Sequence, residues 1–149
     1  MKLAMMLHLL GVVVWVGGMF FAYMALRPAA SRLLEPPQRL SLWAATLGRF
    51  FNWVWLCVVL VLGSGFYMLA AIGDLGRVPI RIHAMLYVGV VMTLIFGYVF
   101  AVMFAALKRA VAGGNWKEGG AALNQIRIAV AINLSLGLIN IVIATAGAM

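Results

Sequence analysis

Charged side chains are scarce in this sequence: 9% of its 149 residues are Asp, Glu, Lys or Arg, and only three of them are acidic. A soluble domain carries about 25% charged residues, which supply most of its polar surface. With 66% hydrophobic residues, this chain lacks the means to cover itself in that way. The composition therefore predicts a protein whose main surroundings are lipid.

Motifs for covalent or phosphate chemistry are also lacking. The single cysteine, Cys57, excludes an intramolecular disulfide and any paired-cysteine metal site. The chain has no phosphate-binding loop, no His-Glu-x-x-His motif and no convincing Ser-His-Asp set. The three acids, Glu35, Asp74 and Glu118, lie outside the apolar runs, which disfavours proton pumps and ion-coupled transporters because these rely on intramembrane acids. Whether the protein is an enzyme stays open.

Four apolar segments are each long enough to cross a bilayer, which takes about 20 helical residues. They cover about residues 3–26, 50–72, 79–107 and 128–149. The sequence thus predicts an all-α fold, an integral membrane four-helix bundle that forms a single domain over residues 1–149.

Helix-breaking residues suggest where these helices end. We expect Pro28 to stop the first helix and Gly73 to end the second, while Pro79 suits the first turn of the third. Residues 38–49 are less apolar than a span but carry apolar side chains at helical spacing, so they predict an interfacial lead-in to the second helix.

Basic residues are distributed unequally between the two ends of the predicted bundle. Lys2, Arg77 and Arg81 lie on one side, and eight lie on the other: Arg27, Arg32, Arg39, Arg49, Lys108, Arg109, Lys117 and Arg127. Since cytoplasmic loops carry the excess of Lys and Arg, both termini are predicted on the outer, periplasmic side of a bacterial inner (plasma) membrane. Topology thus accounts for the net charge of +8, and no nucleic-acid partner is expected.

The two histidines are the most informative polar residues, because ionisable groups within a span are costly and often functional. His8 and His83 each follow the start of a predicted helix by a few residues. The first and third helices run parallel in an alternating bundle, so both histidines are predicted at one level, roughly 6–9 Å from the outer ends. Facing imidazoles are natural ligands for a metal or for haem iron. The alternative, in which each histidine only hydrogen-bonds a neighbouring helix, stays open.

Haem b is the leading ligand in this interpretation, with electron transfer or redox chemistry near the periplasmic face. Gly11 and Trp15 share the helix face of His8, where small residues leave room for a flat macrocycle. Arg77 and Arg81 are placed to pair with haem propionates. Helix packing explains the glycine equally well, and interfacial anchoring explains the arginines.

Copper is the alternative ligand, because imidazole suits it and thioethers favour Cu(I). Met5, Met68 and Met85 are expected near the level of the histidines. Such a protein would transport copper or confer resistance to it. A third interpretation is a structural accessory subunit of a membrane complex. Besides the lipid bilayer, the partners considered are a second copy of the chain and other membrane or periplasmic redox or copper proteins.

Several stretches resemble the CopD (copper resistance D) family of membrane proteins. Residues His8–Gly11 and Trp15–Gly18 are similar to its opening helix, and Arg49–Phe51, Gly63–Gly65 and His83 are similar to its short, single-module members. This resemblance implies a helical inner-membrane protein associated with copper uptake or resistance. The size and four-helix plan are also distantly similar to HemJ-type protoporphyrinogen oxidases, which would imply b-type haem.

Overall fold

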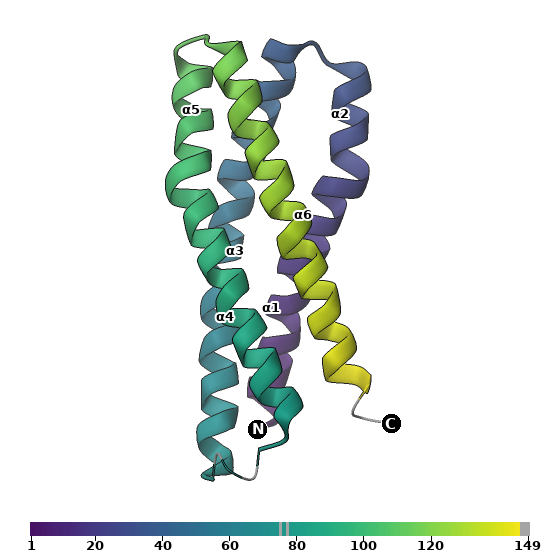
Figure 1. Ribbon diagram of the computed structural model, residues 1–149, viewed down its shortest axis with the longest axis vertical. Helices are drawn as coiled ribbons and strands as arrows, with labels where there is room; N and C mark the ends of the chain where they lie inside the picture. The colour runs from purple at the N-terminus through teal and green to yellow at the C-terminus, as the bar shows by residue number, and fades with distance from the viewer. Residues whose placement is uncertain (75, 77, 147–149) are drawn as a thin grey trace.

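A computed structural model describes residues 1–74, 76 and 78–146 of the chain, and within these residues the regular structure is helical, without a strand. Figure 1 shows long helical segments that run up and down alternately. α1 and α4 begin, and α3 and α6 end, at the end of the bundle that carries the chain termini, hereafter the terminal end. The connections from α2 to α3 and from α5 to α6 lie at the opposite, basic end.

The first segment consists of α1 (Lys2–Phe21), the π-helical turn η1 (Ala22–Leu26) and α2 (Arg27–Leu33). The prediction that Pro28 stops this helix is wrong. Proline has no N–H and its ring displaces the carbonyl four residues earlier, but the first turn of a helix tolerates it. The widened turn η1 comes directly before α2, so that Pro28 occupies such a first-turn position and the helix continues.

The second segment is one continuous helix, α3 (Pro36–Ile72), which has proline in its first turn. The predicted lead-in over residues 38–49 belongs to this same helix, since no breaker separates the two. Its place at the membrane interface stays a prediction. Its buried side chains Leu40, Trp43 and Leu47 continue the stripe that Phe51 extends. The helix ends at Gly73, as predicted, where φ of +79° suits glycine.

The third segment comprises α4 (Ile80–Tyr98), the π-helical turn η3 (Val99–Phe104) and α5 (Ala105–Ala112), and the fourth is α6 (Trp116–Ala146). Both extend beyond the predicted apolar runs. Asn115 caps α6, because its side-chain Oδ1 accepts a hydrogen bond of 3.2 Å from the backbone N–H of Glu118. Capping and polar first turns lengthen a helix without adding hydropathy, which is why the sequence pattern placed the start of the fourth helix too late.

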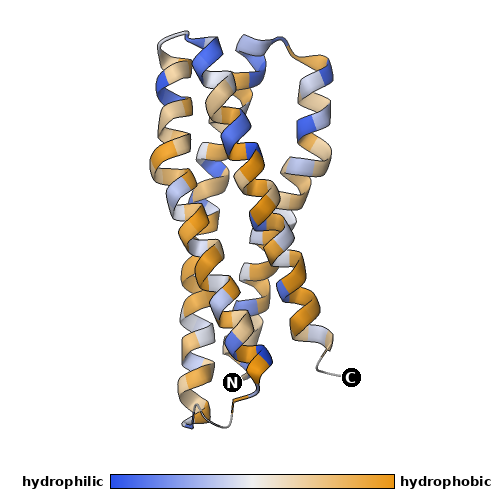
Figure 2. Cartoon of the chain, viewed as in Figure 1, coloured by the Kyte–Doolittle hydropathy of each residue, from blue (hydrophilic) through white to orange (hydrophobic). Residues whose placement is uncertain are grey.

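In the part of the chain that the structure describes, four helical segments are long and apolar enough to cross a membrane: Lys2–Leu33, Pro36–Ile72, Ile80–Ala112 and Trp116–Ala146. Large apolar side chains such as Val13, Leu94 and Val142 are exposed on their outer faces. Figure 2 shows the hydrophilic residues gathered toward the basic end, with mainly hydrophobic residues along the middle of the bundle. The chain is thus a multi-pass membrane protein. Which side of the membrane its termini face stays a prediction.

The helices are held by close backbone approach and by aromatic rings. A Cβ placed on Gly11 of α1 would lie 2.7 Å from Val61 Cγ2 and 3.3 Å from the carbonyl oxygen of Cys57, so α1 and α3 are in close contact there. Further toward the basic end, the ring of Phe51 packs edge-on against Phe96 and Phe104, with centroids 5.3 and 5.0 Å away. These contacts fix the second segment against the first and the third.

Candidate functional site

His8 joins the first helix to the second through its side chain. Its half-buried imidazole lies with Nδ1 3.0 Å from Oγ of Ser64 on α3. Ser64 is 8% exposed, and its hydroxyl donates to the carbonyl oxygen of Leu60 in its own helix. Since polar side chains within a bilayer need partners, this pair satisfies two of them at once.

The hydrogen bonds of Ser64 favour one proton position on His8. A serine hydroxyl has one proton, and the carbonyl oxygen of Leu60 in its own helix is an acceptor for it. With that proton on the carbonyl oxygen, we assign to His8 the tautomer in which the Ser64 oxygen accepts from Nδ1–H and Nε2 of the neutral ring keeps its lone pair free. Metal-binding histidines commonly use this arrangement, in which one ring nitrogen donates to a fixed acceptor and the other faces the ion.

Gly65 provides the surface on which the imidazole rests. A Cβ at this glycine would lie 3.5 Å from Cε1 of His8, in ordinary van der Waals contact. The ring therefore lies against bare helix backbone beside its hydrogen-bond partner. The Gly63–Gly65 segment, which resembles a family motif, thus supplies both the acceptor and the adjoining surface for His8.

Two of the predicted methionine ligands lie in the same direction from this pair. Met5 precedes His8 by three residues on α1, and Met68 follows Ser64 by four residues on α3, so each lies about one helical turn from its neighbour on the same side of its helix. α1 and α3 run antiparallel, and both steps therefore lead toward the terminal end. Met5 is 51% exposed, and Met68 is half-buried.

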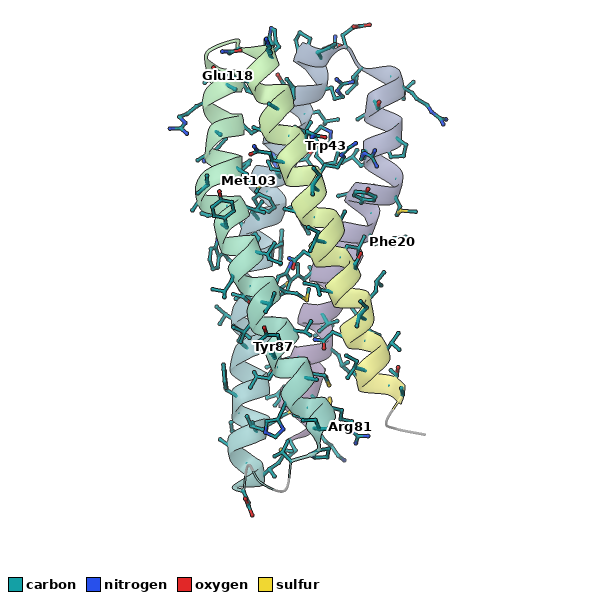
Figure 3. The ribbon with its side chains drawn as sticks, in the orientation of Figure 1. Phe20, Trp43, Arg81, Tyr87, Met103 and Glu118 are labelled. Carbon is teal, nitrogen blue, oxygen red and sulfur yellow. The ribbon has the colours of Figure 1, made fainter. Side chains whose placement is uncertain are left out.

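The other predicted residues lie on α4 or just before it. His83 is exposed, Met85 is half-buried, and the carbonyl oxygen of Met85 accepts a hydrogen bond of 3.3 Å from Nδ2 of Asn140 on α6. Arg81 lies near the foot of α4 in Figure 3, and Arg77 is outside the described residues. The recorded partner of His8 is Ser64 rather than His83, and a site shared by both histidines stays a prediction.

The haem interpretation is not supported by the packing around Gly11 and Trp15. The space beside Gly11 is taken by Val61 and by the backbone of α3. Trp15 is 3% exposed and packs edge-on against Phe96, with ring centroids 6.2 Å apart. The face that was predicted to leave room for a macrocycle is thus a helix–helix contact.

Among the described residues, no three or more His, Cys, Asp or Glu side chains form a metal-binding group, so an ion at His8 needs thioether or other ligands.

A second site, which sequence reasoning missed, lies toward the basic end. A cavity of about 270 Å³ is lined by Arg27, Arg39 and Arg127 together with aromatic side chains from several helices. In the sequence these arginines stand 12 and 88 positions apart and were assigned to loops as a topology signal. The sequence did contain one indication that these arginines lie on helices rather than in loops: Arg39 and Arg127 fall in stretches with helical spacing of apolar residues.

The family model for copper resistance protein D matches residues 44–147 of this chain, which is more than half of its length. The matched part includes Ser64, Met68, His83 and Met85, whereas His8 and Met5 precede it. No curated protein and no solved structure matches the chain, and similarity to the HemJ-type oxidases is not shown. The fold, with its four spans, agrees with this match, and the chain belongs to the CopD (copper resistance protein D) family.

Proposed function

We propose that this protein binds copper at the terminal end of its bundle and transports or delivers the ion across or along the membrane in copper resistance. Membership of the CopD family favours copper over haem as the ligand. The observation that carries the site is the hydrogen bond from His8 to Ser64, because it leaves Nε2 of His8 free as a ligand at a defined place.

The ligand set that we propose consists of Nε2 of His8 and the thioether sulfurs of Met5 and Met68. Imidazole suits copper in general, whereas soft thioethers select Cu(I) over harder cations. All three ligands are uncharged, so a bound monovalent ion keeps its charge and is not held as tightly as by thiolates or carboxylates. Such a set fits an ion in transit better than a permanent cofactor.

His83 and Met85 are two further possible donors near the start of α4, at the same end of the bundle, but they lie two residues apart and so point to different sides of the helix. Because His83 is exposed, we propose that it takes part in the entry or release of copper rather than in the inner site. By the excess of basic residues at the opposite end, the terminal end would face the periplasm of a bacterium. The partner that supplies or receives the ion would then be a periplasmic or membrane copper protein, or a second copy of this chain.

Titration of the purified protein with Cu(I), in detergent and against a coloured Cu(I) chelator, tests the proposal. We expect saturable binding, and an affinity lower by about 10-fold or more in His8→Ala, since loss of one ligand from so small a set removes a large share of the binding energy. Absence of saturable binding in the unchanged protein would contradict the proposal and favour the structural accessory subunit.

A matched pair of methionine variants tests the ligand set. Met5→Leu removes a thioether on the side of His8, whereas Met6→Leu removes its neighbour, which points about 200° around the helix from His8. Both side chains are 51% exposed, so the two substitutions disturb packing alike. We expect Met5→Leu to weaken Cu(I) binding and Met6→Leu to leave it unchanged. Equal effects of the two would exclude Met5 as a ligand.

A further inference from the structure

The cavity at the basic end is formed by all four helical segments. Its walls come from α1, η1 and α2 on one side, from α3 and α6 on others, and from α4 and η3 toward the middle of the bundle. Trp43, one of its lining residues, is seen in Figure 3 in the half of the bundle nearer the basic end. With a volume of about 270 Å³, it is close in size to the smaller pockets that hold organic ligands.

Three guanidinium groups border this cavity without a carboxylate partner. Arg27, Arg39 and Arg127 come from α2, α3 and α6, and among the residues that the structure describes none of them forms an ion pair with an acidic side chain. Arg27 lies over the ring of Tyr23, 4.9 Å from its centroid, which holds it at the cavity wall. Three cations of one sign at one cavity favour an anion and repel copper ions.

The deeper part of the cavity contains a buried acceptor that lacks a donor. Asn133 of α6 lines the cavity and is 4% exposed, and its Nδ2 donates to the carbonyl oxygen of Met92 at 3.3 Å. Among the described residues its Oδ1 has no hydrogen-bond partner. Because a buried carbonyl oxygen is costly to leave unpaired, this atom is a suitable acceptor for a donor group of a molecule in the cavity.

The spacing of these polar groups describes the shape of the molecule that would fit. Asn133 follows Arg127 by six residues on the same helix, which corresponds to about 9 Å along its axis. Between the two levels the cavity is lined by aromatic rings, among them Phe51 and Phe96. A small hydrated ion would leave these apolar walls uncovered.

We propose that the cavity binds an amphipathic anion, with a carboxylate or phosphate group at Arg27, Arg39 and Arg127, an apolar or aromatic body between the rings, and a hydroxyl or N–H donor at Asn133. This chemistry occurs both in membrane lipids and in soluble organic acids. The proposal does not rest on copper binding, because none of the copper ligands lines the cavity.

The rigid fluorescent acid 6-hydroxy-2-naphthoate is a suitable probe, since it has a carboxylate and a hydroxyl at opposite ends of a flat ring system. We expect it to bind saturably to the protein in neutral detergent. The compound 2-naphthol, which lacks the carboxylate, is expected to bind about 10-fold more weakly. Equal binding of the two compounds would overturn the proposal, because the arginines would then add nothing to the affinity for a carboxylate.

Variants of the arginines and of Asn133 test the two polar ends separately. Arg27→Gln is expected to weaken binding of the probe about 10-fold, whereas Arg32→Gln, at an exposed arginine of the same helix that is absent from the cavity lining, is the control and leaves it unchanged. Asn133→Leu should remove the preference for 6-hydroxy-2-naphthoate over 2-naphthoate. Circular dichroism confirms that each variant is folded. Equal affinities of Arg27→Gln and Arg32→Gln would overturn the assignment.

Competition by lipid then identifies the source of the natural ligand. Displacement of the probe by phosphatidylglycerol but not by phosphatidylcholine would support an anionic membrane lipid. Displacement by neither, with the arginine effect intact, would support a soluble organic acid. Equal displacement by both lipids would overturn the proposal, since the cavity would then take up acyl chains without regard to charge. His8→Ala serves as a further control and is expected to bind the probe as the unchanged protein does.

Discussion

The two ends of this bundle offer opposite chemistry to a ligand. At the terminal end, His8 is an uncharged imidazole fixed by Ser64, with methionine sulfurs a helical turn away. At the basic end, three arginines face a cavity with aromatic walls. Soft neutral donors attract a copper ion, whereas guanidinium groups attract an anion. Four apolar helices would thus keep the proposed cation site and the proposed anion site apart within one small domain.

The two sites also differ in how much of the fold each requires. The His8–Ser64 pair depends on one helix pair, α1 and α3, which are packed tightly at Gly11. The cavity needs α2, α3, α4 and α6 in their correct places. Changes in the bundle interior should therefore weaken binding at the proposed anion site before they weaken binding at the proposed copper site.

The largest expected difference between the two ends is in their accessibility from outside the cell, because each end lies entirely on one side of the membrane. In a Cys57→Ser background, Asp74→Cys lies at the terminal end, two residues after α3 ends, and Glu118→Cys lies at the basic end, in the first turn of α6. If the positive-inside rule holds here, a membrane-impermeant maleimide added to intact cells labels the first and spares the second. The reverse labelling would place the copper ligands on the cytoplasmic side and refute the predicted topology.

Phe51→Ala is expected to cause the largest loss of stability among single substitutions. Phe51 is 3% exposed and contacts Phe96 and Phe104 edge-on. In lipid the transfer term is small, since separated helices are solvated by acyl chains, but a cavity of about 100 Å³ costs about 2–3 kcal/mol. Unfolding in mixed SDS micelles measures this loss, and the control is Phe20→Ala, at a side chain that is 51% exposed. Equal losses would show that the aromatic cluster does not hold the basic half together.

Gly11→Ala tests the packing that supports the copper site. The new methyl group would lie 2.7 Å from Val61 Cγ2 and 3.3 Å from the carbonyl oxygen of Cys57, so Val61 or the helix pair must shift, at a cost of about 1–2 kcal/mol. Gly17→Ala on the same helix meets nothing within 4 Å and is expected to be neutral or stabilising, because alanine favours helix. The same unfolding assay measures both. If the copper affinity of Gly11→Ala is unchanged although its stability falls, the His8–Ser64 pair does not depend on this contact.

Ser64→Ala is the mildest of these changes and acts on one end alone. Without its acceptor, the imidazole of His8 is no longer held in one orientation and tautomer. Loss of such a partner typically lowers metal affinity 10- to 100-fold, and we expect the lower end of this range, about 1.4 kcal/mol. Competition titration with Cu(I) measures the effect, and binding of 6-hydroxy-2-naphthoate at the other end is expected to stay the same. An unchanged Cu(I) affinity would show that Ser64 serves only helix packing.

Long apolar runs made the four spans predictable, because in a bilayer nearly every residue of a spanning helix must be apolar. The helix ends were less predictable. Pro28 lies inside a helix because the π-helical turn before it removes the conflict, and such a turn has no signature in hydropathy. Gly73 was predicted correctly, since its left-handed backbone conformation is a local requirement.

The copper candidates could be predicted only in part. His8 and His83 stand out because polar residues are rare in such helices, and their role as ligands stays a prediction. The role of Ser64 was not foreseen, since its pairing with His8 spans 56 positions and depends on the register between α1 and α3. For the same reason the arginine cavity was missed: its residues meet only after four helices are placed side by side.

The π-helical turn at Ala22–Leu26 makes the number of residues in this stretch as important as their identity. A turn of this kind holds one residue more than the α-helical turn that it replaces. Because the turn spreads this extra residue over its own length, deletion of one residue there would restore a regular helix and leave the residues after it facing nearly as they do now. Deletion of one residue from the regular part of α1 would instead rotate everything after it by about 100°. Arg27 and Ser31, which line the cavity, would then face elsewhere. In this chain the effect of a one-residue deletion thus depends on whether it falls inside the π-helical turn or outside it.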